Sequence, residues 1–287
     1  MIRGLVERIF INPQIILRFV LVISRIESTF GSCKPGSVNE TFSLVVDSST
    51  LKKISIESGF VSTVDSVEDS YYGAAITPDG LYCLASVKLK NQTFTIKNIS
   101  IIDNSYVYPH YKLLVNPSVS AFFTSPVGIS IAPDGAFALV ADTSGKIQKI
   151  DLDRHLVVPS IAGIVSGSSW LNPFQDGQGP TASFTNPTDV RISPDGQYAL
   201  VADYGNHRIR KIEGLSASIT MVSTIAGSLQ GYLDGSNSLF NYPNSIAISQ
   251  DGQYALVADS NNHAIRKILR EVEAGAASER SGGRRGV

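Results

Sequence analysis

The chain of 287 residues has a formal net charge of −1, which gives no electrostatic case for nucleic-acid binding. Charged residues make up 17% and hydrophobic residues 43%, the balance of a packed globular protein rather than a disordered one. Two cysteines exclude a disulfide-rich scaffold and leave the redox compartment open.

The first 31 residues differ from the rest of the chain. Ile15–Ile23 (IILRFVLVI) is apolar but is interrupted by Arg18, and the run is too short for a clear membrane span. Two interpretations of residues 1–31 stay open: a signal or anchor, and an element that covers the edge of the folded domain. Three N-glycosylation sequons are compatible with secretion and leave the compartment undetermined: Asn39, Asn91 and Asn98.

Residues 32–270 contain a repeated unit. Pro187–Ile212 returns as Pro243–Ile268, with 18 of 26 positions identical at an offset of 56 residues. Earlier units match less closely, and five units are recognisable from their turn aspartates or equivalents: Asn39, Asp79, Asp134, Asp195 and Asp251. Repetition at such a spacing predicts a repeat architecture.

Each unit predicts four short antiparallel strands, here named a to d in chain order. In the Pro187 copy, strand a (Val190–Ser193) ends at a Pro-Asp-Gly turn, and strand b (Tyr198–Ala202) is apolar on both faces. Strand c (Arg208–Ile212) alternates charge and isoleucine, and strand d is Met221–Ala226. A strand buried on both faces is typical of a propeller blade packed between two neighbours.

An aspartate follows strand b in four of the five units. Its carboxylate is placed to accept hydrogen bonds from amides of the next turn, so we interpret these residues as structural turn caps: Asp47, Asp142, Asp203 and Asp259. In the second unit Val87 replaces the aspartate. The same unit places Cys83 in strand b, which favours a buried reduced thiol, although a bridge to Cys33 stays open.

The fifth unit stops after its third strand, near Arg270. A three-stranded blade leaves an unpaired edge, so we predict that Ile15–Ile23 pairs beside Ala264–Leu269 or covers that edge as a helix. Residues 271–287 lack apolar periodicity and are predicted to form a disordered tail.

A second recurring phrase precedes the fourth and fifth units: AG, then DG, then F-x-x-P. Together with PDG and VAD-x-x-N-H-x-I it resembles the NHL repeat, whose signature reads Asn206-His207-Arg208 and Asn262-His263-Ala264 in this chain. The resemblance implies a β-propeller, usually six-bladed in that family. We therefore predict an all-β propeller with five recognisable four-stranded blades, which is partial or atypically closed; a fragment of a larger NHL protein is an alternative.

Antiparallel order predicts where the polar residues of the loops meet. The b–c turns and d–a connections share one face of a propeller, and the Pro-Asp-Gly turns lie on the other. We predict that the first face binds a protein or other macromolecule through these residues: Asp176, Asp189, Tyr204, Asn206, His207, Arg208, Asn244, Asn262 and His263. The structural alternative is that Asn206 and His207 only complete their turn.

An enzymatic alternative follows from the resemblance. Some proteins similar to this family are zinc-dependent lyases, and similar propellers include metal-dependent lactonases, so a hydrolase or lyase with a metal in the central channel is the rival interpretation. Zinc needs three or four converging ligands, and the four histidines are not expected to converge: His110, His155, His207 and His263. We therefore predict no metal, no cofactor and no catalytic residues, and favour a non-enzymatic scaffold.

Overall fold

The computed structural model describes residues 6–9, 26–27, 42–47, 49–55, 61–66, 70–101, 123–154, 156–164 and 174–270. These residues form five antiparallel sheets and three short 3-10 helices, which confirms the all-β prediction. Among them, no helix has the length and hydropathy needed to cross a membrane.

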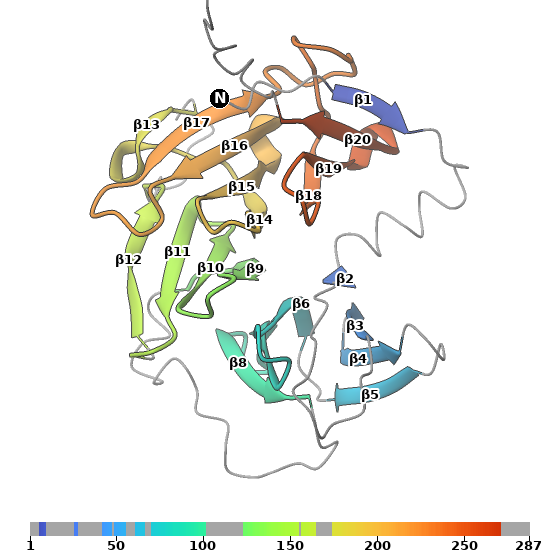
Figure 1. Ribbon diagram of the computed structural model, residues 1–287, viewed down its shortest axis with the longest axis vertical. Coiled ribbons are helices and arrows are strands. Elements are labelled where there is room, and N and C mark those ends of the chain that lie inside the picture. The colour runs from blue at the N-terminus through green and yellow to red at the C-terminus, as the bar shows by residue number, and fades with distance from the viewer. Residues whose placement is uncertain are drawn as a thin grey trace, which may run out of the picture.

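The five sheets are the blades of a propeller and are numbered along the chain (Figure 1). Blade 1 contains β2 (Ile26–Glu27), β3 (Phe42–Asp47), β4 (Thr50–Ser55) and β5 (Val61–Ser66). Blade 2 contains β6 (Ser70–Ile76), β7 (Tyr82–Lys88) and β8 (Phe94–Ser100). Blade 3 contains β9 (Pro126–Ile131), β10 (Phe137–Asp142), β11 (Lys146–Asp151) and β12 (Leu156–Ala162).

The last two blades hold the closely matched repeats. Blade 4 contains β14 (Pro187–Ile192), β15 (Tyr198–Asp203), β16 (Arg208–Glu213) and β17 (Met221–Ala226), and β13 (Gly177–Gln178) pairs outside β17. Blade 5 contains β18 (Pro243–Ile248), β19 (Tyr254–Asp259) and β20 (Ala264–Leu269). The 3-10 helices are η2 (Gly179–Thr181), η3 (Tyr204–Asn206) and η4 (Ser260–Asn262).

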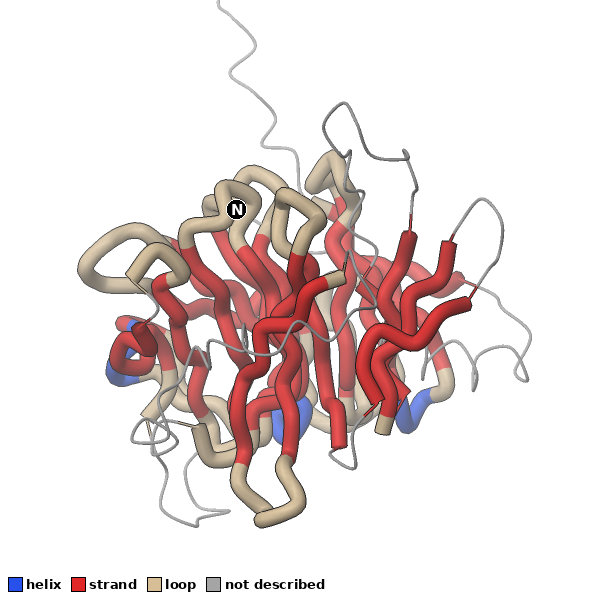
Figure 2. The backbone as a smooth tube through the Cα atoms, turned by 90° about the horizontal axis from the view of Figure 1, so that it is seen from below, coloured by secondary structure: helices blue, strands red, loops and turns tan. Residues whose placement is uncertain are grey.

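The blades stand face to face, and their strands run between two layers of connections (Figure 2). Four clusters of buried residues join blade 1 to 2, 2 to 3, 3 to 4 and 4 to 5. Every residue of β10 and β15 is buried, because each of these strands has a neighbouring blade on both sides. Strand b is apolar on both of its faces, and this pattern correctly predicts a strand that packs between two blades.

The fourth strand of blade 5 comes from the beginning of the chain. β1 (Val6–Ile9) pairs antiparallel with β20, with Val6 opposite Ile268 and Ile9 opposite Ile265. The position beside Ala264–Leu269 that we predicted for Ile15–Ile23 is therefore held by β1, and Ile15–Ile23 lies outside the described residues. The reason is physical: an outermost strand has one face toward solvent, so the sequence VERI, which contains two charged residues, suits it better than a nearly continuous apolar run.

Several other predictions fall outside the described part of the chain. They concern the tail at 271–287, the turn at Asn39, Cys33, and two of the four histidines, His110 and His155. Cys83 is fully buried in β7, as its alignment with Ala199 predicts.

A chain that begins at Phe10 should be less stable than the full protein, because it exposes the unpaired backbone edge of β20. We expect a lower melting temperature, by about 2–4 °C for each kcal/mol lost, together with aggregation seen by light scattering. A chain that begins at Gly4 keeps β1 and is the matched control. Equal melting temperatures for the two truncated chains would contradict the pairing.

Candidate functional site

The b–c turns and d–a connections of blades 4 and 5 lie together, as the antiparallel order predicts. The Thr185 amide donates to Asp203 Oδ1 at 2.8 Å, and the Gly205 amide donates to the Thr185 carbonyl at 2.8 Å. In blade 5 the Asn261 amide donates to the Asn241 carbonyl at 3.0 Å. We call this surface the loop face; it comprises residues 174–186, 203–208, 227–242 and 259–263.

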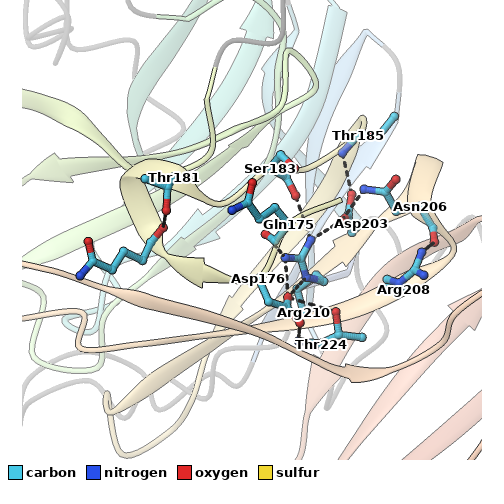
Figure 3. A network of polar contacts seen from close by, with 11 residues as sticks. Gln175, Asp176, Thr181, Ser183, Thr185, Asp203, Asn206, Arg208, Arg210 and Thr224 are labelled. Atoms are coloured by element: carbon cyan, nitrogen blue, oxygen red, sulfur yellow. Dashed lines mark hydrogen bonds and ion pairs between the residues drawn. The ribbon is translucent and has the colours of Figure 1, made fainter. Parts of the chain in front are cut away.

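A buried arginine holds the loop face together in blade 4 (Figure 3). The side chain of Arg210, on β16, is 0% exposed, and its Nη1 donates to Asp203 Oδ2 at 2.8 Å. Its Nη2 contacts Asp176 Oδ1 at 2.6 Å, and Nε donates to the same oxygen at 3.0 Å. Two backbone carbonyls also accept from this guanidinium, those of Gln175 and Ser183. One cation therefore joins the end of strand b to both halves of the d–a connection.

Arg266 repeats this arrangement in blade 5. It donates to Asp259 Oδ2 at 2.8 Å and contacts Asp234 Oδ1 at 2.6 Å, and its side chain is also 0% exposed. The carbonyls of Leu233 and Leu239 accept its remaining Nη hydrogens. The arginine of the shared I-R-K-I phrase is thus a structural residue that our sequence analysis missed; its signal was its return at the same position of both copies.

Three of the four aspartates that we interpreted as turn caps are fully buried, Asp142, Asp203 and Asp259, but only Asp142 has a hydrogen bond from an amide of its own turn. Asp142 accepts from the amides of Thr124, Ser125 and Ser144, and Ser144 belongs to the turn that follows. Asp203 also accepts from an amide of the preceding connection, that of Thr185, but from its own turn it accepts from the side chain of Asn206 at 2.8 Å instead of an amide. The side chain of Asp47 lies outside the described part of the structure.

The charge pairing explains this difference at Asp203 and Asp259. In these blades Oδ2 of the carboxylate pairs with the guanidinium of Arg210 or Arg266, and Oδ1 accepts from the amide of Thr185 or Asn241. Asn206 and Asn262 complete the set, each donating to the same aspartate oxygen at 2.8 Å. Both predicted binding asparagines therefore have a structural contact as well.

His207 lies at the centre of an aromatic cluster. It has a left-handed backbone (φ 56°), and its Nδ1 accepts a hydrogen bond from the Tyr242 amide at 3.1 Å. The Tyr242 ring lies 4.5 Å from the His207 ring and 4.7 Å from the Tyr204 ring. Burial and the neighbouring Arg208 lower the pKa of His207. The b–c turn of blade 4 is thus joined to the entry of blade 5.

The remaining predicted residues divide between surface and interior. The guanidinium of Arg208 lies 3.4 Å from the Phe174 ring centre, and His263 is exposed in the equivalent turn of blade 5. Asn244 is partly buried on β18, where its carbonyl accepts from Thr188 Oγ1 at 2.9 Å. Asp176 is 42% exposed beside Arg210.

Asp189 corrects our surface assignment, because it is only 3% exposed. It accepts from Ser245 Oγ at 2.6 Å and from the Ile246 amide at 2.9 Å, both in blade 5, and lies 3.3 Å from Arg191 Nη2. Burial raises its pKa to about 7. Strand a is innermost in the blade, so a polar residue on it meets the next blade instead of solvent. Asp189 therefore joins blades 4 and 5.

An exposed apolar loop is the second feature that the sequence analysis missed. Three side chains of the connection between β17 and β18 are solvent-exposed: Leu229 (74%), Tyr232 (43%) and Leu233 (48%). The backbone of this loop is held by Asn262 Nδ2, which donates to the Gly231 carbonyl at 2.7 Å, and by Arg266. The loop is therefore anchored through its backbone and through the Tyr232 ring, whose centre lies 4.9 Å from the Arg266 guanidinium, while Leu229, Leu233 and part of Tyr232 stay exposed.

The opposite face offers a different environment. A cavity of about 260 Å³ lies between the a–b turns of blades 4 and 5, lined in part by Asp195, Tyr198, Asp251 and Arg270. Within the described ranges, no group of three or more His, Cys, Asp and Glu residues is arranged to hold a metal ion.

Replacing Arg210 with Met should destabilise the protein by about 3–5 kcal/mol, because Asp203 would remain buried without its cation. The matched control, Arg208→Met, removes a half-exposed cation from the same strand and should cost less than about 1 kcal/mol. Urea unfolding measures both values. Similar losses for the two variants would show that the buried pair is not what holds the loop face.

His207 should titrate below its usual value of about 6.5, because burial disfavours its charged form. The unfolded state then binds the proton first, so this contribution to stability is lost as the pH falls below about 6.5. NMR titration of the imidazole measures the pKa. In His207→Gln the decline of stability between about pH 7 and 5 should be shallower; an unchanged decline would contradict this role.

The loop face and blade geometry can be compared with known proteins. The NHL repeat model matches residues 240–268, which run from Phe240 through β18, β19 and β20. A chloroplastic protein of Arabidopsis thaliana, SUPPRESSOR OF QUENCHING 1, is 33% identical over 152 residues, covering 51% of this chain and 14% of that protein. NHL repeat-containing protein 2 of Bos taurus is 29% identical over 170 residues, which cover 56% of this chain and 22% of that protein.

An enzyme and a binding protein are also similar to this chain. A probable peptidyl-alpha-hydroxyglycine alpha-amidating lyase of Caenorhabditis elegans is 23% identical over 178 residues, covering 61% of this chain and 46% of the lyase. The crystal structure of an auxiliary nutrient binding protein from Bacteroides ovatus superimposes with a TM-score of 0.63 at 19% identity, covering 81% of this chain and 57% of the other.

The chain spans less than half the length of each of these three sequence relatives. The matched repeat contains the Asn262-His263 turn, Asp259 and Arg266, which are the residues that build the loop face in blade 5. Together with the five-sheet architecture, these matches show that the chain is a β-propeller that carries an NHL repeat at residues 240–268 and is similar to NHL repeat-containing proteins.

Proposed function

We propose that this protein is a non-enzymatic NHL-repeat scaffold that binds a partner protein through the loop face. The observation that carries the proposal is the exposed apolar group of Leu229, Tyr232 and Leu233 on a rigidly anchored loop. Exposed apolar side chains on a fixed scaffold are typical of protein interaction surfaces, since water leaves them when a partner binds.

Hydrogen bonds connect this loop to the turns of two blades. Gln230 Nε2 donates to Asn241 Oδ1 at 3.0 Å, next to the residue whose amide donates to His207. On the other side, Asn262 donates to Gly231. A partner that contacts the loop would therefore also meet the turns at His207 and His263. Preordered loops lose little conformational entropy on binding, which favours affinity.

The charges of the loop face suit a mixed apolar and polar interface. Its two buried arginines are already paired with aspartates, so they are not available to a partner as free cations. Tyr204, Tyr232 and Tyr242 offer aromatic contact area, and Arg208 supplies a guanidinium at the rim. Tyrosine and arginine are the residue types that most often dominate binding energy in protein interfaces.

The similarity to the amidating lyase supports a second candidate, a metal-dependent hydrolase or lyase with its site in the central channel. Metal analysis of the purified protein separates the candidates. Zinc or calcium at a stoichiometric level, retained after dialysis and lost together with a hydrolase or lyase activity on chelation, would favour the enzyme. The scaffold hypothesis expects binding to be unchanged by chelation.

A photo-crosslinking amino acid at Tyr232 should capture a partner protein, because this side chain is 43% exposed on the loop face. The same group at Tyr82, which is 41% exposed beside an a–b turn on the opposite face, should not. With the captured partner purified, Tyr232→Ser should raise the Kd at least about tenfold, while Tyr82→Ser leaves it unchanged. Capture from position 82 alone would mean that the functional face is the opposite one.

A further inference from the structure

Two of the three N-glycosylation sequons lie in the described part of the chain, and both belong to blade 2. Asn91-Gln92-Thr93 lies in the b–c turn between β7 and β8, whereas Asn98-Ile99-Ser100 lies within β8. As sequence motifs the two are equivalent, because each has an asparagine followed two positions later by a hydroxyl residue. The structure gives them different surroundings.

The turn between β7 and β8 is a tight, exposed hairpin. The Leu89 amide donates to the Thr93 carbonyl at 2.8 Å, and the Gln92 amide donates to the Leu89 carbonyl at 2.9 Å. Gln92 has a left-handed backbone (φ 67°), which completes the reversal of the chain. Asn91, Gln92 and Thr93 are all exposed, so solvent reaches every side chain of this sequon.

Thr93 holds the carboxamide of Asn91 by its oxygen. Asn91 Oδ1 accepts from the Thr93 amide at 3.0 Å and from Thr93 Oγ1 at 2.6 Å. Among the residues that the structure describes, Asn91 Nδ2 donates no hydrogen bond. The nitrogen to which an N-linked glycan is joined is therefore the free end of an ordered and exposed side chain.

Asn98 has the opposite environment. It lies opposite Leu84 of β7, and residues opposite each other in a strand pair face the same side of the sheet. Leu84 is 1% exposed in the cluster that joins blades 2 and 3, and Asn98 Oδ1 is buried as well. The next residue, Ile99, is 4% exposed in the cluster that joins blades 1 and 2. A glycan at Asn98 would have to separate packed blades.

We propose that Asn91 is an attachment site for an N-linked glycan and that Asn98 is not. The glycan donor is an oligosaccharide joined to a lipid through a diphosphate. Asn91 Nδ2 forms a bond to the anomeric carbon of the first sugar, and the bond from that carbon to the diphosphate oxygen breaks. The electron pair of the broken bond leaves with the diphosphate, and Nδ2 gives one proton to a base of the transferase.

The site is separate from the loop face. The clusters that join blade 2 to blade 3 and blade 3 to blade 4 place blade 3 between Asn91 and the nearest blade of the loop face. A glycan at Asn91 is thus carried by a blade that contributes no residue to that surface, and the proposal does not depend on the function of the loop face.

Expression through the secretory pathway of a eukaryotic cell tests the site. The full chain carries a cleavable signal before Met1 together with Asn39→Gln, and Ser100→Thr gives both remaining sequons the same hydroxyl residue. Peptide mass spectrometry measures the glycosylated fraction of each asparagine in soluble protein from the medium and from the lumen of the cells. We expect occupancy at Asn91 to exceed that at Asn98 at least about tenfold, because a bulky glycan is compatible with the fold only at the surface.

Variants of the turn separate the sequon from its surroundings. Asn91→Gln and Thr93→Ala should each remove the glycan, whereas Thr93→Ser should keep it, because its hydroxyl preserves the sequon. An endoglycosidase should release the glycan from the folded protein without denaturant, since the whole turn is exposed.

The opposing outcomes are distinct. An unmodified Asn91 in the lumenal protein would overturn the proposal, and so would similar occupancy at Asn91 and Asn98 in the soluble protein. Release of the glycan that requires denaturant would show that the turn is covered, which contradicts the exposure on which the proposal rests.

Discussion

The buried pairing of an arginine on strand c with an aspartate at the end of strand b organises blades 4 and 5. Arg210 and Asp203 are both 0% exposed, so neither charge is stable without the other. The guanidinium also reaches Asp176, a residue 34 positions away in the chain. A strand, a turn and a long connection are thereby held by one cation, and Arg266 does the same in blade 5.

Anchored connections allow apolar residues to remain exposed. In the loop before β18, Arg266 and Asn262 bind backbone carbonyls, so Leu229 need not turn inward to order the chain. Blade 3 has a different design: its buried residue at the arginine position is Gln148, and Asp142 is satisfied by backbone amides. The loop face therefore lies on blades 4 and 5, the two blades in which an arginine holds the connection before strand a.

Packing between blades imposes a second constraint. Each blade has two different faces, and residues of neighbouring blades are buried together in shared clusters. Asp189 contributes polar contacts to this packing, since it joins β14 to Ser245 and the Ile246 amide of blade 5. The backbone edge of β20 is a separate problem and is paired by Val6–Ile9.

The sequence by itself determined the strands, the five units and the sharing of one face by the b–c turns and d–a connections. These features follow from local alternation, turn residues and antiparallel order, which need no knowledge of distant contacts. Only the tertiary structure decided that Asp189 is buried, that Arg210 bridges two segments, and that Val6–Ile9 pairs with β20. Each of these depends on which residues a neighbouring blade or connection brings close. Identical YALVAD strands show the reason plainly: Tyr198 is buried and Tyr254 is exposed because burial is set by what packs against a strand, not by its own sequence.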